Sequence, residues 1–441
     1  MKAILRVCIV LFLLAALLPV SAAAAAAPPA DPTCAAVAAE LGLTYESVML
    51  NGAITCTLYP PKLLWNRDVV VFAHGYIDAR QAIGIPWEGQ LIREEVNIPQ
   101  LVTALGYAFA TTSYHKNGLA VQEGVADVVA LVKHVRAVNS RARRFFLVGA
   151  SEGGLVTALG MERYPTVFTG GLSTCGPIGS FSGQVQYWED FRVAFDSYFP
   201  NVLAAPFDPV TMTVPFGPST PIYIDPFVVE NWEMVADTFV VPWLASDPGA
   251  VEALLAQTGV PIDAADPVNT AGQSILELLY YNTQATNDGR LTLNPSMTPD
   301  QLPPPSLLGN PYLNLSYITP DYPAGLQRDP VAVAALKAYE TTGKLSKPMI
   351  IMHTTGDPVI PFNQSARYLA KALRAGRLSK TILLPVDRYG HCNFTAVELV
   401  LGFYTMVLRS TSVPFSAKQI DAALPDAGQQ MEFEALQDAT R

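Results

Sequence analysis

The feature that most constrains this chain is a serine held between two glycines at the end of an apolar strand. The segment reads Phe145-Phe146-Leu147-Val148-Gly149-Ala150-Ser151-Glu152-Gly153-Gly154. A serine hydroxyl is a weak nucleophile at neutral pH and needs a neighbouring base together with N–H donors for an oxyanion. The G-x-S-x-G spacing permits a sharp turn, because Gly149 and Gly153 carry no side chain that would collide at its narrowest point. We therefore predict that Ser151 is a nucleophile.

The residues on either side predict the strand and the helix that such a turn requires. Phe145–Val148 is an apolar run typical of a buried strand, and Leu155–Tyr164 has a helical pattern that ends before Pro165. Because the motif is short, an idle serine on a glycine-rich turn is the alternative. The matching flanks favour the nucleophile.

The composition allows a large core and argues against nucleic acid as a partner. The chain has 441 residues, enough for one large domain or two ordinary ones, and half of them are hydrophobic. Its formal charge is −10, and it contains no run rich in Lys and Arg. Nucleic-acid binding usually needs such a basic run or patch.

Residues 1–27 are predicted to be a signal peptide. Lys2 and Arg6 precede the apolar segment Ile9–Val20, and small residues that suit cleavage follow over Ser21–Ala27. The apolar segment is short for a membrane span, and no stop-transfer pattern follows it. A retained membrane anchor is the alternative. We expect a secreted or periplasmic protein with no stable membrane anchor once the signal is removed.

Four cysteines remain after removal of the signal peptide, which takes Cys8 with it. An even number in an oxidising compartment predicts two disulfides, with three possible pairings. Free buried thiols are the alternative. The four are Cys34, Cys56, Cys175 and Cys392.

Strands and helices alternate in two separate parts of the chain. In the first part, a helical pattern over Gly124–Val138 lies between predicted strands. The strands expected there are Ala53–Tyr59, Val69–Ala73, Tyr107–Ser113 and Phe145–Val148. The elements expected in the second part are the strands Pro348–His353 and Lys380–Leu384 and the helices Gln364–Ala375 and Phe394–Arg409. This alternation predicts an α/β fold with a mostly parallel, doubly wound sheet.

The segment 176–345 breaks that rhythm and is rich in proline and aromatic residues. It contains plausible helices at Ser274–Tyr281 and Val331–Tyr339. The simplest organisation is a core formed by residues 28–175 and 346–410, interrupted by this insertion. Residues 411–441 are expected to be a polar tail with little core potential. The aromatics and prolines concerned are Trp188, Trp232, Trp243 and the run 303–305.

His391 is the predicted base for the serine. It follows the last predicted strand and precedes the last helix, at the carboxyl end of the sheet, where ligands bind in open α/β folds. A satisfied structural histidine is the alternative. Of the other four histidines, His134 is expected at the surface and His74 lies in the loop after Val69–Ala73. His353 ends a strand and His115 follows one, so either could contribute to the architecture of the site.

Asp357 is the predicted acid that orients His391. It follows the Pro348–His353 strand by a short turn, which is also where structural Asp-Pro turns occur. Asp387 is the runner-up, but it lies only four residues before the base, and its reach is awkward.

The oxyanion is expected to be bound by the backbone N–H groups of Glu152 and Tyr76. Glu152 directly follows the nucleophile, and Gly75 lets the loop that carries Tyr76 approach closely. We expect His74 to support this loop rather than to transfer protons. The Glu152 side chain has no assigned role beyond pairing with a nearby cation or capping the helix start.

With these residues in place, the chain resembles the α/β-hydrolase superfamily. The order Ser151, Asp357, His391, the His74-Gly75 loop and the serine turn all match, over roughly residues 50–175 and 345–410. The motifs look similar to the secreted esterase and lipase branch and to the prolyl-oligopeptidase-like branch. The resemblance implies an eight-stranded, mostly parallel sheet and hydrolysis through an acyl-enzyme.

In that family setting the insertion would be a cap over the site. Its aromatic residues fit an apolar acyl pocket or the core of the cap itself. The resemblance also suggests roles for the cysteines. Cys34 with Cys56 would tie down the N-terminal segment, and Cys175 with Cys392 would hold the loop of the base rigid.

The leading hypothesis is an exported serine hydrolase that cleaves carboxylic esters, small or lipid-like, without a metal or organic cofactor. A serine peptidase of the prolyl-oligopeptidase type is the alternative, and a non-catalytic binding protein on the same fold is a third. The alcohol, the acyl group and the oligomeric state stay open.

Overall fold

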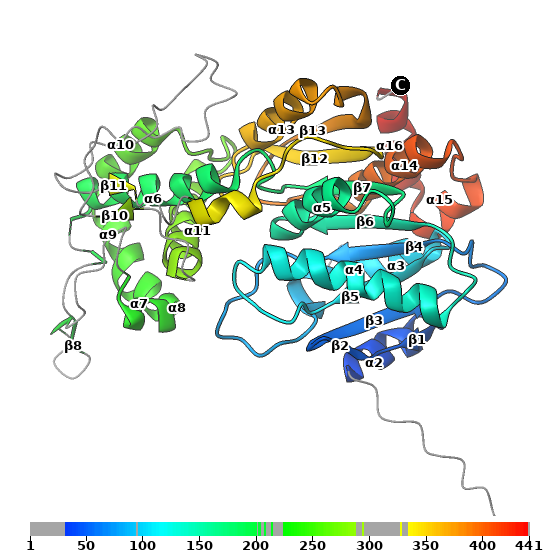
Figure 1. The fold of residues 1–441 in the computed structure, drawn as a ribbon. Coiled ribbons are helices and arrows are strands. Elements are labelled where there is room, and N and C mark those ends of the chain that lie inside the picture. Colours follow the sequence, from blue (N-terminus) through cyan, green and yellow to red (C-terminus); the bar gives the residue numbers. More distant parts are fainter. Residues whose placement is uncertain are drawn as a thin grey trace, which may run out of the picture.

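The computed structural model describes residues 31–93, 96–200, 202–203, 207–208, 213–214, 224–287, 293–294, 327–328 and 334–439. The predicted signal peptide lies outside these residues, as do the proline run 303–305 and residues 331–333 of an expected helix. The described part is a twisted sheet between two helical layers, with a group of helices at one end of it (Figure 1).

A nine-stranded sheet forms the centre of the fold. Its main path runs β1-β3-β5-β4-β6-β7-β12-β13, and β2 pairs with β3 at one side. From β5 to β13 every neighbouring pair is parallel, whereas β1, β2 and β3 pair antiparallel. The predicted α/β fold with a mostly parallel sheet is confirmed. The strands are β1 (Thr44–Glu46), β2 (Met49–Leu50), β3 (Ala53–Tyr59), β4 (Val69–Ala73), β5 (Ala108–Thr112), β6 (Phe145–Ala150), β7 (Gly170–Thr174), β12 (Met349–Gly356) and β13 (Thr381–Tyr389).

Helices cover both faces of the sheet, as the alternating pattern requires. Alternate residues of a strand point to opposite faces, so in β4 Val69 and Val71 join one apolar core while Val70 and Phe72 join the other. The first core packs under α4 (Val121–Val138) and α5 (Glu152–Arg163). The second packs under α2 (Pro32–Glu40), α3 (Ile98–Ala104) and α14 (Ala396–Thr411). Beside β13 lies α13 (Asn363–Arg374), followed by a short helical turn, Leu378–Lys380.

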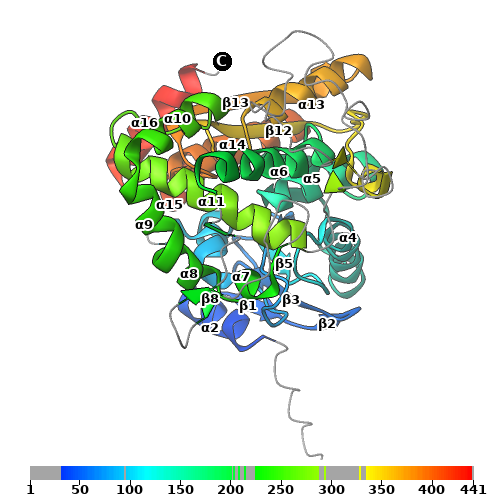
Figure 2. The same ribbon diagram turned by 90° about the vertical axis from the view of Figure 1, so that its left-hand side faces the viewer.

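The insertion forms a cap of helices across the carboxyl ends of the strands, which Figure 2 shows from its outer side. Its apolar residues continue the core under α4 and α5, and buried Trp188 and Trp232 belong to that core, whereas Trp243 is exposed. The helical segments are α6 (Phe181–Tyr198), α7 (Pro226–Glu230), α8 (Trp232–Val235), Ala236–Val240, α9 (Val241–Ser246), α10 (Pro248–Thr258), α11 (Pro267–Asn287) and Leu336–Tyr339. Two small two-stranded antiparallel sheets pair β8 (Phe207–Asp208) with β9 (Thr213–Val214) and β10 (Leu293–Asn294) with β11 (Gln327–Arg328).

The C-terminal segment corrects one expectation, since it is more than a polar tail. It forms α15 (Ala417–Ala423) and α16 (Ala427–Ala439). Leu424 and Phe433 are buried in the same core as α14, and the Phe433 ring packs edge-on against Tyr404 of α14. The few apolar residues of this segment were too sparse to predict burial, because the surface that covers them belongs to a distant part of the fold.

Among the described residues, no single helix has both the length and the apolar character to span a membrane. One bent pair, Trp232–Ser246 with Pro248–Thr258, meets that length and composition together across a 94° break.

Candidate active site

Ser151 lies on a sharp turn between β6 and α5. Its backbone has φ 56° and ψ −123°, a conformation that residues other than glycine rarely adopt. A Cβ on Gly149 would lie 2.1 Å from the carbonyl oxygen of Gly153, and a Cβ on Gly153 would lie 2.0 Å from that of Ala73. Both positions therefore have to be glycine. The Ser151 N–H donates to the Thr174 carbonyl at 3.0 Å, which ties the turn to β7.

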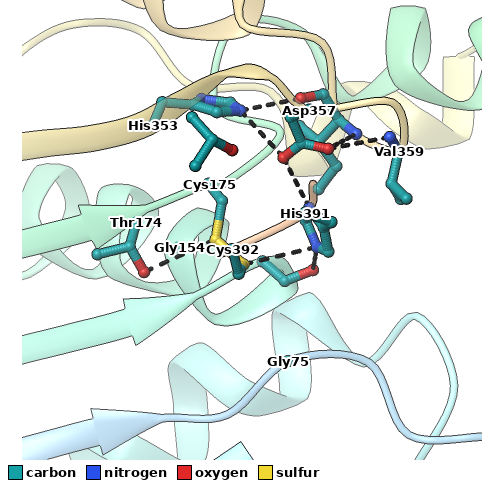
Figure 3. Close-up of a disulfide and its surroundings, with 12 residues drawn as sticks. Gly75, Gly154, Thr174, Cys175, His353, Asp357, Val359, His391 and Cys392 are labelled. Carbon is teal, nitrogen blue, oxygen red and sulfur yellow. Dashed lines mark hydrogen bonds and ion pairs between the residues drawn. A yellow bond between two sulfur atoms is a disulfide. The ribbon is translucent and has the colours of Figure 1, made fainter. Parts of the chain in front are cut away.

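The structure brings Ser151, His391 and Asp357 together in one hydrogen-bonded chain. The Ser151 Oγ lies 2.9 Å from His391 Nε2, and His391 Nδ1 lies 2.7 Å from Asp357 Oδ2. The three residues follow the carboxyl ends of β6, β13 and β12, which are neighbours or near neighbours in the sheet. Figure 3 shows His391 between the Asp357 carboxylate and the rim of the sheet. The arrangement allows proton transfer from serine to imidazole, with the carboxylate holding the ring in position.

Asp357 is fully buried and held from several sides. Its Oδ1 accepts the backbone N–H groups of Val359 and Ile360, both at 2.9 Å, within the Asp-Pro turn. Its Oδ2 faces His391 and also lies 3.4 Å from Nε2 of His353, a buried residue of β12 (Figure 3). Burial alone raises the pKa of Asp357, but the charge of His391 and the hydrogen bonds from both histidines outweigh it and lower the pKa below the usual value. Asp357 is therefore a carboxylate at neutral pH.

His391 is more basic than an ordinary histidine. Burial by itself lowers its pKa, but the charge and hydrogen bond of Asp357 act in the other direction, and Glu277 adds to them. The guanidinium of Arg93 opposes this rise, as the last of the contributions. The net result is a raised pKa, so the imidazole can take a proton more readily than it could in water.

The alternative acid and two of the other histidines lie in separate interactions. Asp387 is exposed and accepts a hydrogen bond from the Thr355 hydroxyl at 2.9 Å. His115 pairs with Asp127 at 2.7 Å, and His134 lies 3.2 Å from Glu46. The structure therefore places Asp357, and not Asp387, against the base. Of the two histidines expected to contribute to site architecture, only His353 contacts the triad in the described residues.

The loop after β4 is fixed by Gln90, which sequence reasoning missed. The Gly75 N–H donates to Gln90 Oε1 at 2.7 Å, and Gln90 Nε2 donates to the Tyr76 carbonyl at 3.1 Å. A Cβ on Gly75 would lie 3.3 Å from the Ser151 Cβ, so the loop runs directly beside the nucleophile. Because the Gly75 N–H is engaged by Gln90, it does not compete with the N–H of Tyr76, which stays the predicted donor toward an oxyanion. The second predicted donor, Glu152, is the first residue of α5, where N–H groups point out of the helix.

His74 supports this loop through contacts with Gly75 and Tyr114. Its ring stacks on Tyr114 with centroids 3.8 Å apart, its Nδ1 donates to the Gly75 carbonyl at 2.7 Å, and its own carbonyl accepts the Tyr114 hydroxyl. Burial lowers the pKa of His74 to about 4, so the ring is neutral at physiological pH. These contacts agree with a supporting role for His74.

The cap contributes Glu277 and Tyr281 of α11 to the surroundings of the site. The Tyr281 ring packs edge-on against the Tyr76 ring, with centroids 5.9 Å apart, and stacks on Trp188, with centroids 5.3 Å apart. These contacts join the cap to the loop after β4. Burial raises the pKa of Glu277, and one of its carboxylate oxygens has no hydrogen-bond partner. The Glu152 side chain is buried, and its charge contributes to the raised pKa values of Tyr114 and Tyr281. No local pattern marks Gln90 or Glu277, because each becomes relevant only through a distant partner.

Both expected disulfides are present. Cys34 is bonded to Cys56, and Cys175 is bonded to Cys392, with Cα atoms 5.8 and 5.4 Å apart. The second lies at the rim of the site (Figure 3), with Cys392 Sγ 3.6 Å from His391 Nε2. Cys175 and Cys392 have φ values of 45° and 52°, so their backbones are strained where they meet.

Cys175, Cys392 and His391 lie close together, but they do not form a metal site. Potential ligand atoms of Cys175, Cys392 and His391 lie within 4.8 Å of one another. A cysteine, however, binds a metal ion as a thiolate, and both of these sulfurs are in the disulfide.

Replacing Cys175 and Cys392 with serine is expected to lower activity without unfolding the protein. The bond ties the loop of His391 to the end of β7, and a displacement of about 1 Å at the base costs on the order of 10²-fold in rate. The matched control is the Cys34/Cys56 double serine variant, which should lose about 3 kcal/mol of stability and keep its activity while folded. Ester hydrolysis and thermal melting of both variants test this. Equal activity in both variants, or a peptide mass map with both rim cysteines as free thiols, would contradict it.

Comparisons with known proteins give only remote similarities. No known protein family and no curated protein sequence matches the chain. Among solved structures, an esterase from Pyrococcus furiosus is 12% identical, with 86% of this chain and 94% of that chain covered and a TM-score of 0.41. An acylaminoacyl peptidase from Pyrococcus horikoshii is also 12% identical, with coverage of 79% and 38% and a TM-score of 0.38. A membrane phospholipase A described as a bacterial virulence factor is 12% identical, with coverage of 100% and 99% and a TM-score of 0.34.

The chain spans less than two fifths of the acylaminoacyl peptidase that it matches. Similarities this remote give no information about substrate. The mostly parallel sheet, the helices on both of its faces and the sharp turn at Ser151 are the features that the sequence patterns predicted.

Proposed function

We propose that this protein is a serine hydrolase that cleaves carboxylic esters with Ser151, His391 and Asp357. The observation that carries the proposal is the continuous hydrogen-bonded chain from the serine Oγ through the imidazole to a buried carboxylate. A serine on a sharp turn, a base with a raised pKa and a carboxylate with a lowered pKa all favour acyl transfer by serine.

In the first step the Ser151 Oγ attacks the ester carbonyl carbon and its proton passes to His391 Nε2. The carbonyl oxygen becomes an oxyanion, toward which the N–H groups of Tyr76 and Glu152 would donate. The carbon–oxygen bond to the alcohol then breaks, and the alcohol leaves with the proton held by His391. A water molecule, deprotonated by the same nitrogen, attacks the acyl-enzyme; the acid leaves and the proton returns to Ser151.

Peptide hydrolysis is the second candidate, and Glu277 is the observation that favours it. Its carboxylate lies close enough to interact with His391 and has an oxygen without a hydrogen-bond partner. Such a group could bind the ammonium of a peptide amino terminus. An ester needs no such contact, and the rest of the site makes no distinction between the two.

The decisive experiment compares p-nitrophenyl esters with peptide p-nitroanilides, using the mature chain. We expect turnover of the esters, labelling of Ser151 by a fluorophosphonate probe, and neither in Ser151→Ala. Faster turnover of the anilides would favour the peptidase. Absence of both labelling and turnover in the folded protein would leave the non-catalytic binding protein as the answer.

We further propose that the protein is exported. The predicted signal peptide supports this, and so do the two disulfides, since such bonds persist mainly in oxidising compartments. Its substrate would then be a small or lipid-like ester outside the cytoplasm.

A further inference from the structure

An apolar cavity lies between the sheet and the helices α3 and α14, on the face of the sheet that carries Val70 and Phe72. It holds about 800 Å³ of empty space when the open solvent at its mouth is included. Its walls are almost entirely apolar, and Gln90, Arg93 and Thr174 are the polar residues among them. We call it the sheet-face cavity.

The register of the strands gives the length of the sheet-face cavity. The strand residues that line it lie at three successive heights along the sheet. Ala150 and Thr174 pair at one end, Val148 and Phe72 pair in the middle, and Val70 lies at the other end, where it pairs with Phe146. Along β6, Ala150 and Phe146, the partner of Val70, are four residues apart, so the cavity extends for about 13 Å along the strands. An extended chain advances roughly 1.2 Å per bond. A straight chain of about ten carbons therefore matches this length.

The sheet-face cavity leaves residues of the central strand β6 less buried than expected. β6 is a central strand with parallel neighbours on both sides, and such strands are normally buried on both faces. Val148 and Ala150 are nevertheless only partly buried. Across the cavity, Leu101 of α3 and Leu399 of α14 are partly exposed as well. The helices that cover the rest of this face leave these side chains open.

The upper end of the sheet-face cavity adjoins the proposed catalytic residues. Ala150 is bonded to Ser151, and Cys392 is bonded to His391 and lies 3.6 Å from its Nε2. Gln90 lines the cavity and also accepts the N–H of Gly75, beside the nucleophile. A group attached to the Ser151 Oγ would therefore meet the cavity past Gln90 and Cys392.

We propose that the sheet-face cavity binds the acyl chain of the substrate, so that the enzyme prefers esters of straight fatty acids of about ten carbons. This inference rests on the proposed ester hydrolysis. The aromatic residues of the cap fitted either an acyl pocket or a core, and the structure places Trp188 and Trp232 in the apolar core that the cap shares with α4 and α5. Acyl selection is instead located on the sheet, and it is distinct from the chemistry at Ser151.

The test is the chain-length profile of p-nitrophenyl esters from acetate to palmitate. The wild-type kcat/KM should be more than about tenfold higher for decanoate than for acetate, because each buried methylene adds to binding. Val148→Phe fills the middle of the cavity and should remove this preference while acetate turnover is kept. Val386→Phe is the matched control, since Val386 packs on the same face of the sheet outside the cavity. Leu399→Trp fills the cavity from α14 and replaces Val148→Phe if that variant does not fold.

Binding of decanoate to Ser151→Ala, measured by calorimetry, separates this inference from the proposed function. We expect decanoate to bind and the added Val148→Phe change to weaken binding by about tenfold or more. If no ester is hydrolysed but decanoate binds in this way, the proposed function and the predicted ester preference fail, and the cavity remains a binding site for a straight aliphatic chain. If esters are hydrolysed with a flat chain-length profile, or if both filling variants keep the wild-type profile and decanoate affinity, the cavity assignment is overturned.

Discussion

Replacing Ser151 with alanine is expected to lower the kcat for ester hydrolysis by about 10⁶-fold. The variant keeps the turn, the base and the oxyanion loop, but it has no atom that can form the acyl-enzyme. His391→Ala should cost about as much, because the serine then has no base within 2.9 Å of its Oγ. The measurement is steady-state and single-turnover hydrolysis of a p-nitrophenyl ester.

Two controls accompany the Ser151 prediction. The melting temperature should change little, because the hydroxyl makes its contact with His391 at a partly open site rather than in the core. The Ser151→Ala/His391→Ala double variant should be no slower than either single variant, since the two residues act as one unit. Most of the activity remaining in either single variant would remove both residues from the proposed mechanism.

Replacing Asp357 with asparagine is expected to lower kcat by about 10⁴-fold, less than the loss of the nucleophile. The carboxylate does not attack; it holds the His391 ring through the 2.7 Å bond to Nδ1 and stabilises the imidazolium that forms. Asparagine can present an N–H to that nitrogen and favour the wrong tautomer. Hydrolysis that is unchanged in Asp357→Asn but lost in Asp387→Asn would reassign the acid.

The same variant should also change the pH dependence of kcat/KM. His391 has to be neutral to accept a proton, so activity is lost as the pH falls through its pKa. The raised pKa places this midpoint above the ordinary 6.5 in the wild type. Without the carboxylate, burial dominates and the midpoint moves to lower pH.

Glu277→Gln is the matched control, because the charge of Glu277 raises the same pKa while its carboxylate accepts a hydrogen bond from Gln273 and not from His391. It should move the midpoint in the same direction by less and leave the plateau rate nearly unchanged. A midpoint that moves to higher pH in either variant would contradict the assignment of His391 as the base.

Local patterns were sufficient to predict where most strands of the central sheet lie, although β13, which precedes His391, extends to Tyr389 rather than ending at Leu384. The apolar runs of β3 and β4 predicted both strands to the residue, because each is bounded by turn residues and buried within one sheet. The serine turn was predictable for a similar reason: the clash that excludes a Cβ at Gly149 and Gly153 arises between residues close in sequence or on the adjacent strand.

Other features depend on residues that meet only in the folded chain. Gln90 has the composition of any surface glutamine until Gly75 and Tyr76 lie against it. Glu277 becomes part of the site because α11 lies across the ends of the strands. The helices after residue 416 were missed because their burial relies on Tyr404 and the rest of the α14 surface.

The sequence by itself determined the order of the strands along the chain, the serine turn and the residues proposed for the triad, since turn sterics and strand ends are local properties. The tertiary structure decided which of the two candidate acids faces the base, what holds the loop after β4, and where the sheet-face cavity lies. Those answers come from distances between separate elements and from a space that packing leaves open on one face of the sheet. Neither is encoded in any short stretch of residues.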